Sequence, residues 1–313
     1  MTDRAALVLA ARETIAAGSQ SFAAASKLFA VPVRERAWLL YAWCRAADDL
    51  TDGQELGHAV EARPASAAHD TQAELERLTR LALTTAEPVP LAFAALRAVA
   101  RETRLPHGLV ADHLAGFGLD AAGWRPQSED DLLRYCYHVA GSVGCMMAVV
   151  MGVDPADEDT LDRACDLGLA FQLANIARDV VPDASAGRCY LPAQWLVEAG
   201  LTEADLADPT HRPAAAEPAQ RLVDLAAAYR QSSRIGAARL PLRSRLAVLA
   251  ADAIYGAIGE RVAALGPAAW DQRVRISGAG KLLCLGQAAT RALATPRPAP
   301  RAGLWTRPRQ SAN

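Results

Sequence analysis

The sequence lacks the cysteine pairs, histidine clusters and charge excess that would indicate a redox, zinc or nucleic-acid-binding protein. Its six cysteines are scattered and none forms a C-x-x-C pair, so we expect reduced core cysteines in a cytoplasmic protein. Its six histidines show no metal-ligand spacing. With 33 basic and 35 acidic residues, the net charge of -2 lacks the basic excess that nucleic-acid binding normally requires.

Long hydrophobic runs are also missing. The N-terminal residues include acids and no long apolar stretch, so no signal peptide is expected. The uncharged run from Val139 to Val153 is shorter than the ~20 residues that a membrane span needs. We therefore expect a cytoplasmic protein whose contact with membranes, if any, is peripheral.

The sequence is instead rich in helical patterns. The chain of 313 residues is 51% hydrophobic, and its apolar residues recur at helical rather than alternating spacing. Ser128, followed three residues later by Asp131, predicts a helix start. No break between helical segments is long or polar enough to divide the chain. We predict an all-α, single catalytic domain over residues 1–294 and, because residues 295–313 are rich in Pro and Arg and contain no acid, a disordered basic tail.

The segment YAWCRAADDLTD raises the question of why an apolar helix should end in three aspartates. Tyr41, Arg45, Asp48 and Asp52 follow the spacing i, i+4, i+7 and i+11, so they share one face of a helix. Two carboxylates on adjacent turns repel one another unless a cation lies between them. Asp49 points away from this stripe. A solvated helix end that only aids solubility explains the aspartates equally well.

A second segment, FQLANIARDVVPD, repeats this spacing. Its stripe consists of Gln172, Asn175 or Ile176, Asp179 and Asp183, and two arginines, Arg178 and Arg188, lie close by in the sequence. Carboxylate oxygens suit Mg²⁺ or Mn²⁺, and arginines clamp phosphate oxygens. Two helices that each end in D-x-x-x-D can face one another across a cavity. The pattern therefore predicts a diphosphate held by divalent cations so that its carbon–oxygen bond can ionise.

Two local features modify this prediction. Pro182 directly precedes Asp183, and because proline disfavours helix, Asp183 is expected to leave the helical stripe. A carbocation would also need a dry, aromatic pocket. The segment RYCYHVAGSVG offers Tyr135 and Val139 one turn apart, followed by small residues that leave room for long hydrocarbon tails or, alternatively, allow close helix packing.

The sequence resembles the squalene/phytoene synthase family, most closely its bacterial phytoene synthases. The motifs that carry this resemblance are GSQSFAAASKLF, LLYAWCRAADDLTD, YCYHVAGSVG, ACDLGLAFQLANIARDVVPDA, RCYLP and, more weakly, WDQRVRISGAGK. Together they cover nearly the whole chain before the tail. The resemblance implies the all-α isoprenoid synthase fold, a helical bundle around a central cavity.

The resemblance also implies roles for individual residues. The metal ligands would be Asp48, Asp52, Asn175, Asp179 and Asp183. The catalytic residues would be Tyr135, Arg45 and Arg178. The substrate-binding residues would be Ser19, Ser21, Phe22, Tyr41, Val139, Gln172, Arg188, Tyr255 and Arg273.

The implied activity is the head-to-head condensation of two geranylgeranyl diphosphates, through prephytoene diphosphate, to phytoene in carotenoid biosynthesis. Two or three Mg²⁺ or Mn²⁺ ions would act as cofactors, and NADPH would not be needed. Expected partners are the diphosphate substrate, a downstream desaturase and, peripherally, a membrane, but no nucleic acid. The alternatives are a squalene or dehydrosqualene synthase that uses farnesyl diphosphate, and a non-catalytic helical scaffold.

The basic tail suggests how a membrane could be reached. Arg297, Arg301, Arg307 and Arg309 surround Trp305 and Leu304 without an acid. Basic residues and an interfacial tryptophan favour anionic membranes. We therefore expect the residues after Thr295 to bind membranes reversibly, with a functionless disordered tail as the alternative.

Overall fold

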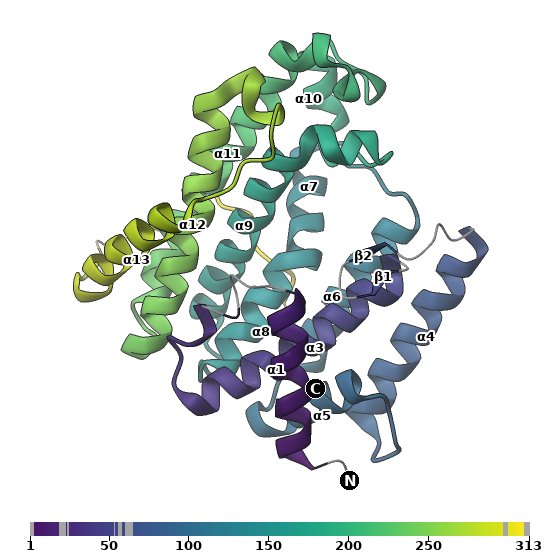
Figure 1. The fold of residues 1–313 in the computed structure, drawn as a ribbon, viewed down its shortest axis with the longest axis vertical. Coiled ribbons are helices and arrows are strands. Elements are labelled where there is room, and N and C mark those ends of the chain that lie inside the picture. Colours follow the sequence, from purple (N-terminus) through teal and green to yellow (C-terminus); the bar gives the residue numbers. More distant parts are fainter. Residues whose placement is uncertain are drawn as a thin grey trace. The chain divides into compact units, whose positions relative to one another are not determined.

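The computed structural model describes residues 3–18, 23, 25–52, 54–55, 58–59, 65–296 and 300–309. Within these ranges the protein is almost entirely helical, as the sequence predicts (Figure 1). The chain forms two compact units where one domain was expected. The first comprises Met1–Ala122 and Met146–Asp157, and the second comprises Gly123–Cys145 and Glu158–Asn313.

The described part of the first unit contains five long helices and one small strand pair. They are α1 (Arg4–Gly18), α3 (Val31–Asp52), β1 (Gln54–Glu55), β2 (His58–Ala59), α4 (Ala65–Thr84), α5 (Leu91–Thr103) and α6 (His107–Ala121). The two strands are antiparallel, with Gln54 opposite Ala59. The end of α8 (Ser142–Val150) returns the chain to this unit.

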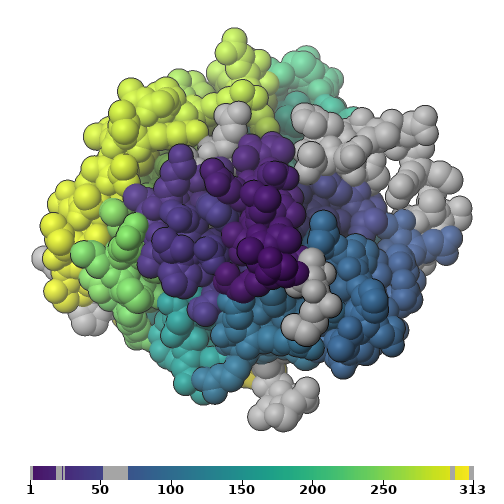
Figure 2. Space-filling view, turned by 60° about the horizontal axis from the view of Figure 1, so that its bottom comes forward, coloured from purple at the N-terminus to yellow at the C-terminus, as the bar shows by residue number. Residues whose placement is uncertain are grey.

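Helix α3 is the centre of the first unit. It packs against α1, α4, α5 and α6, and Figure 2 shows α1 in dark purple lying beside the lighter purple α3. Leu40, Trp43 and Ala47 are buried at helical spacing, which gives α3 its core-facing stripe. The Trp43 ring meets His113 of α6 edge-on, with centroids 5.6 Å apart. This packing fixes the rotation of α3 and therefore the direction of its polar stripe.

The second unit is built around a longer helix. Its elements are α7 (Glu129–Cys136), the π-helix η1 (Tyr137–Gly141), the start of α8, α9 (Glu158–Ser185), α10 (Ala193–Glu198), η2 (Ala204–Ala207), η3 (Pro209–His211), α11 (Arg212–Ala237), α12 (Leu242–Leu265), η4 (Gly266–Trp270) and α13 (Gly278–Leu293). The start of α7 confirms the predicted capping box, because the Ser128 hydroxyl accepts from the Asp131 amide while the Asp131 carboxylate accepts from the Ser128 amide.

Helix α9 is the centre of the second unit and packs against α7, η1, α11 and α12. Along its length, residues such as Leu169, Leu173 and Ile176 are buried. The remaining positions near its C-terminal end carry polar side chains. A helix enclosed on most sides is held by tertiary packing, so its few uncovered side chains have well-defined directions.

Residues 300–309 form an ordered strap across the second unit, so the expectation of a disordered tail is wrong for this segment. Arg301 pairs with Asp166, and Arg309 pairs with Asp162, both on α9. The Trp305 indole donates to Asp130 of α7, at 3.0 Å. The expected membrane anchor relied on these arginines. In the structure, Arg301 and Arg309 are paired with buried acids of α9, so their charges are already matched within the protein.

Within the part of the chain that the structure describes, no helix is long and apolar enough to span a membrane.

Candidate active site

The C-terminal end of α9 carries the predicted acidic stripe. Contrary to expectation, α9 continues through Pro182 to Ser185, so Asp183 stays on the same helical face as Asp179. The buried neighbours Val180 and Val181 hold this last turn against the core, which offsets the hydrogen bond that proline removes. The two carboxylates therefore lie one turn apart on a face that the core does not cover.

Two arginines surround Asp179. Arg178 donates from Nε to both carboxylate oxygens, at 3.0 and 3.1 Å. Arg273, which follows η4, donates from Nε and Nη2 at 3.1 and 2.9 Å. Although burial opposes the effect, these two guanidinium groups lower the pKa of Asp179. The structure thus brings Arg273 to Asp179, 94 positions earlier in the sequence.

The pKa of Asp183 is shifted in the opposite direction from that of Asp179. Burial, followed by the negative charge of Asp179, raises the pKa of Asp183 to about 6. Arg188, Arg178 and Arg273 oppose this shift by their charges. Within the described residues, the Asp183 side chain has no hydrogen bond or ion pair of its own. A half-buried carboxylate of this kind would be stabilised by an added cation.

Asn175 and Gln172 of α9 lie near the two aspartates, and Tyr255 of α12 contacts Asn175. Tyr255 of α12 is hydrogen-bonded to Asn175, and burial raises the pKa of its phenol. The Tyr255 ring stacks on Phe171, with centroids 4.0 Å apart. Gln172 is half-buried one turn before Asn175 and Ile176. Tyr255 therefore lies beside Asn175 of the α9 stripe, and its stacking partner Phe171 was not predicted.

Tyr135 occupies an aromatic stack. Its ring stacks with those of Trp124 and Tyr190, with centroid distances of 5.6 and 5.0 Å and interplanar angles of 19° and 18°. Both neighbours were missed by the sequence analysis, although Tyr190 belongs to the RCYLP motif. These stacked rings and the burial of Tyr135 fix the position of its side chain.

The small residues after Tyr135 serve close packing. A Cβ atom on Gly168 of α9 would lie 2.3 Å from the Ala140 carbonyl oxygen, and one on Gly144 would lie 2.4 Å from the Ala164 carbonyl oxygen. The backbones of η1, α8 and α9 therefore touch directly. Of the two explanations for these residues, the structure supports helix packing. Val139 is half-buried on η1, and such a π-helical turn is often found at functional sites.

Helix α3 carries the first acidic motif, in the other unit. Arg45 donates from Nε to Asp49 at 2.9 Å, and its Nη1 lies 3.8 Å from Asp48. Asp49, which was not assigned a role, is thus the main partner of Arg45. Burial raises the pKa of Tyr41, whose hydroxyl is so close to Gly18 that a Cβ there would lie 2.6 Å away.

The remaining predicted residues fall outside what the structure describes. These are Ser19, Ser21 and Phe22, together with the side chain of Asp52.

The donor set on α9 fits a divalent cation that keeps part of its hydration shell. Asp179, Asp183 and Asn175 offer hard oxygen ligands on one helical face, and Asp183 has an unneutralised charge. No group of three or more His, Cys, Asp or Glu side chains able to hold an ion is found within the described ranges. Mg²⁺ commonly takes only one or two protein carboxylates and completes its shell with water and phosphate oxygens.

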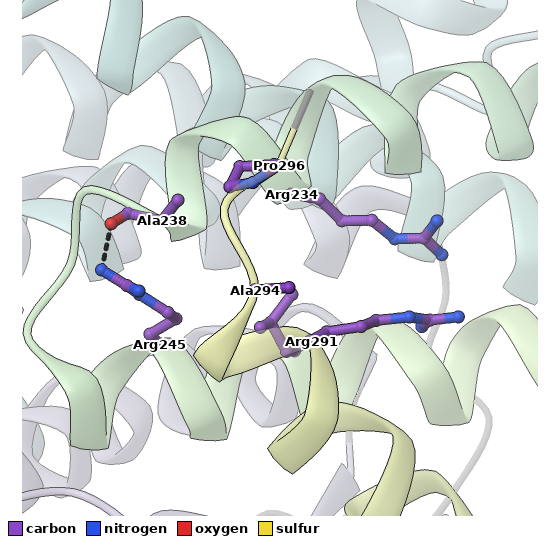
Figure 3. A pocket seen from close by; sticks show the side chains of 7 residues that line it. Arg234, Ala238, Arg245, Arg291, Ala294 and Pro296 are labelled. Carbon is purple, nitrogen blue, oxygen red and sulfur yellow. Dashed lines mark hydrogen bonds between the residues drawn. The ribbon is translucent and has the colours of Figure 1, made fainter. Parts of the chain in front are cut away.

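A separate pocket of about 180 Å³ lies between α11, α12 and the end of α13 (Figure 3). Its lining residues are Arg234, Ala238, Arg245, Leu249, Arg291, Ala294 and Pro296. None of the predicted site residues belongs to it.

An all-α chain with two helices that end in D-x-x-x-D, each with an arginine beside it, is typical of the all-α isoprenoid synthases. The sequence profile of the squalene/phytoene synthase family matches residues 15–279, and the chain belongs to this family. It is 50% identical over 296 residues to a 15-cis-phytoene synthase from Enterobacter agglomerans, covering 93% of this chain and 99% of that protein. A 15-cis-phytoene synthase from Pantoea ananas is 47% identical over 300 residues, with 95% and 96% covered.

Solved structures agree with the fold. The crystal structure of a dehydrosqualene synthase in complex with a ligand is similar with a TM-score of 0.81 at 25% identity, covering 92% of this chain and 96% of that chain. A squalene synthase from Alicyclobacillus acidocaldarius is similar with a TM-score of 0.72 at 22% identity, covering 83% and 94%.

Proposed function

We propose that this protein is a 15-cis-phytoene synthase, a prenyltransferase that joins two geranylgeranyl diphosphates head to head in carotenoid biosynthesis. The observation that carries this proposal is the near-full-length identity of about half to proteins of that name. The solved dehydrosqualene synthase, at 25% identity, is a more distant relative. The C20 substrate is therefore favoured over the C15 substrate.

The residues of α9 suit a diphosphate leaving group. Arg178 and Arg273 lie at Asp179, and the charge of Arg188 acts on Asp183. Guanidinium groups bind phosphate oxygens in a bidentate manner, so these three arginines would orient the diphosphate. Mg²⁺ or Mn²⁺ ions, held by Asp179 and Asp183 and on α3 by Asp48 and Asp52, would neutralise the charge that builds on the leaving diphosphate.

The reaction would pass through prephytoene diphosphate and end without reduction. The carbocations formed when each diphosphate leaves would need protection from water. Tyr135 would act at its edge, through the hydroxyl, to stabilise a cation or accept a proton. NADPH would not be required. The product is a C40 hydrocarbon without polar groups, so it would pass to a bilayer or to a membrane-bound desaturase.

Product analysis tests the proposal. Purified protein with Mg²⁺ is incubated with farnesyl or geranylgeranyl diphosphate, with and without NADPH, and the hydrocarbons are analysed by mass. We expect a C40 hydrocarbon from the C20 substrate alone. A C30 product from farnesyl diphosphate, without C40 product, would assign the protein to the squalene or dehydrosqualene synthases. Product that forms only with NADPH would contradict the non-reductive reaction.

A further inference from the structure

Helix α13 presents an uncharged apolar face to the outside. Leu282, Leu283 and Leu293 are 71%, 65% and 81% exposed. The positions between them on this face are Gly286, Gln287, Ala289 and Thr290, all exposed and none charged. Cys284, Ala288 and Ala292 form the opposite, buried face. An exposed helix surface without charge, bearing three leucines, is unusual for a protein surface that faces only water.

Basic residues accompany this face. After Asp271 the chain contains no Asp or Glu, and eight Lys or Arg residues follow. Four of them, Arg273, Arg301, Arg307 and Arg309, are paired with acids of α9. Arg275, just before α13, and Lys281, in its first turn, are exposed. Apolar residues on one side of a helix with cations beside it form the pattern of helices that lie in the interface of anionic bilayers.

Further arginines are grouped near the C-terminal end of α13, where acids pair with them. Arg230, Arg234 and Arg291 pair with the buried carboxylate of Asp252, and Arg230 also pairs with Glu260. Figure 3 shows the Arg234 and Arg291 side chains with their guanidinium groups at the same end, while Arg245 reaches the Ala238 carbonyl.

We propose that the outer face of α13 docks on an anionic phospholipid bilayer. The leucines would enter the boundary between headgroups and acyl chains. Arg275 and Lys281 would lie near the lipid phosphates. This inference concerns a surface that includes none of the proposed catalytic residues, so it stands independently of the proposed activity.

Vesicle co-sedimentation tests this proposal with the full chain. The vesicles contain either phosphatidylcholine alone or three parts phosphatidylcholine to one part phosphatidylglycerol. The test variant combines Leu282→Ser, Leu283→Ser and Leu293→Ser. The control combines Leu9→Ser, Leu91→Ser and Val197→Ser, three equally exposed apolar residues on other helices. Circular dichroism and a thermal melt establish that both variants are folded.

We expect the wild type and the control to bind the anionic vesicles at least about tenfold more tightly than the α13 variant. Replacing Arg275 and Lys281 by Gln should reduce the preference for anionic over neutral vesicles, and so should about 0.5 M salt, which screens exposed charges. Equal binding of the α13 variant and the control would overturn the proposal. The proposal would also be overturned if the wild type did not bind vesicles but self-associated through α13 in sedimentation velocity. The face would then bind a second copy of the chain.

Discussion

Arg301 of the C-terminal strap forms a two-pronged ion pair with Asp166 of α9, 135 residues earlier in the chain. The Nε–Oδ2 and Nη2–Oδ1 distances are 2.8 and 2.7 Å, and Asp166 is fully buried. Replacing Arg301 by Ala would leave a buried carboxylate without its cation. We expect a loss of unfolding free energy of about 3–5 kcal/mol, measured by urea denaturation.

A double replacement provides the control. Arg301→Met combined with Asp166→Leu removes both charges, so most of the lost stability should return. Arg309 is half exposed, and Arg309→Ala should reduce stability by about 1 kcal/mol or less. If Arg301→Ala and Arg309→Ala are equally mild, the strap is not a stabilising element.

Tyr135, whose ring stacks with Trp124 and Tyr190, should act through its hydroxyl, the group of its side chain that can exchange a proton. Tyr135→Phe keeps the stack and removes only the oxygen. We expect kcat to fall by about 100-fold, as for loss of a general acid or base, with KM and the thermal midpoint little changed. A Tyr135→Phe variant with near-normal kcat would assign the residue to packing alone.

Asp183 gives the site a defined pH dependence. Its pKa is about 6 in the folded protein, above its usual value of 3.8, so between these values the folded state binds more protons than the unfolded state. The free energy of unfolding therefore falls as pH rises from about 4 to about 6. Asp183→Asn should be more stable than the wild type at pH 7 by about 1–2 kcal/mol, after allowance for partial exposure.

The same variant tests whether Asp183 meets a cation. Mg²⁺ with inorganic diphosphate should raise the thermal midpoint of the wild type at pH 7, because a cation bound at Asp183 relieves its repulsion from Asp179. The rise should be much smaller in Asp183→Asn. Equal rises in the two proteins would place the cation elsewhere.

Asp179→Asn removes the anion that two arginines share, and Asp48→Asn removes a carboxylate of the α3 motif. Each change should lower kcat by at least about 1000-fold without loss of helical content, since each removes a carboxylate proposed to hold a divalent cation. Asp224→Asn on α11, whose carboxylate accepts a hydrogen bond from Gln220, should retain activity. Near-normal turnover in either site variant would refute its assignment.

Local patterns predicted the helices and the stripe on α9, since both depend on residues within a few turns. The capping box at Ser128 is confirmed for the same reason. The ordered strap could not be predicted, because the partners of Arg301 lie far back in the sequence. The local preference of Pro182 predicted that Asp183 would leave the helix. This prediction was wrong because the buried Val180 and Val181 hold the last turn of α9 in place.

The Tyr135 stack likewise depends on tertiary structure. Trp124 and Tyr190 come from segments on either side of α9 in the chain, and no spacing rule connects them with Tyr135. The RCYLP motif marked Tyr190 as part of the resemblance but gave it no role. Only the packing of α7 against α9 brings these rings together.

The contact between Gly168 and Ala140 yields a final prediction. A Cβ on Gly168 would lie 2.3 Å from the Ala140 carbonyl oxygen, a backbone atom that no side-chain rotation can move away. Gly168→Ala should therefore force α9 and η1 apart and lower the free energy of unfolding by about 1–3 kcal/mol.

Gly259 of α12 is the matched control, because its Cβ would meet Val223 methyl groups at 3.6 and 3.7 Å, an ordinary contact. Gly259→Ala should raise stability by about 0.5–1 kcal/mol through the better helix propensity of alanine. Because η1 follows Tyr135 directly, Gly168→Ala should also lower kcat more than Gly259→Ala does. Similar stability and kcat in the two variants would show that the close approach of η1 and α9 is not required.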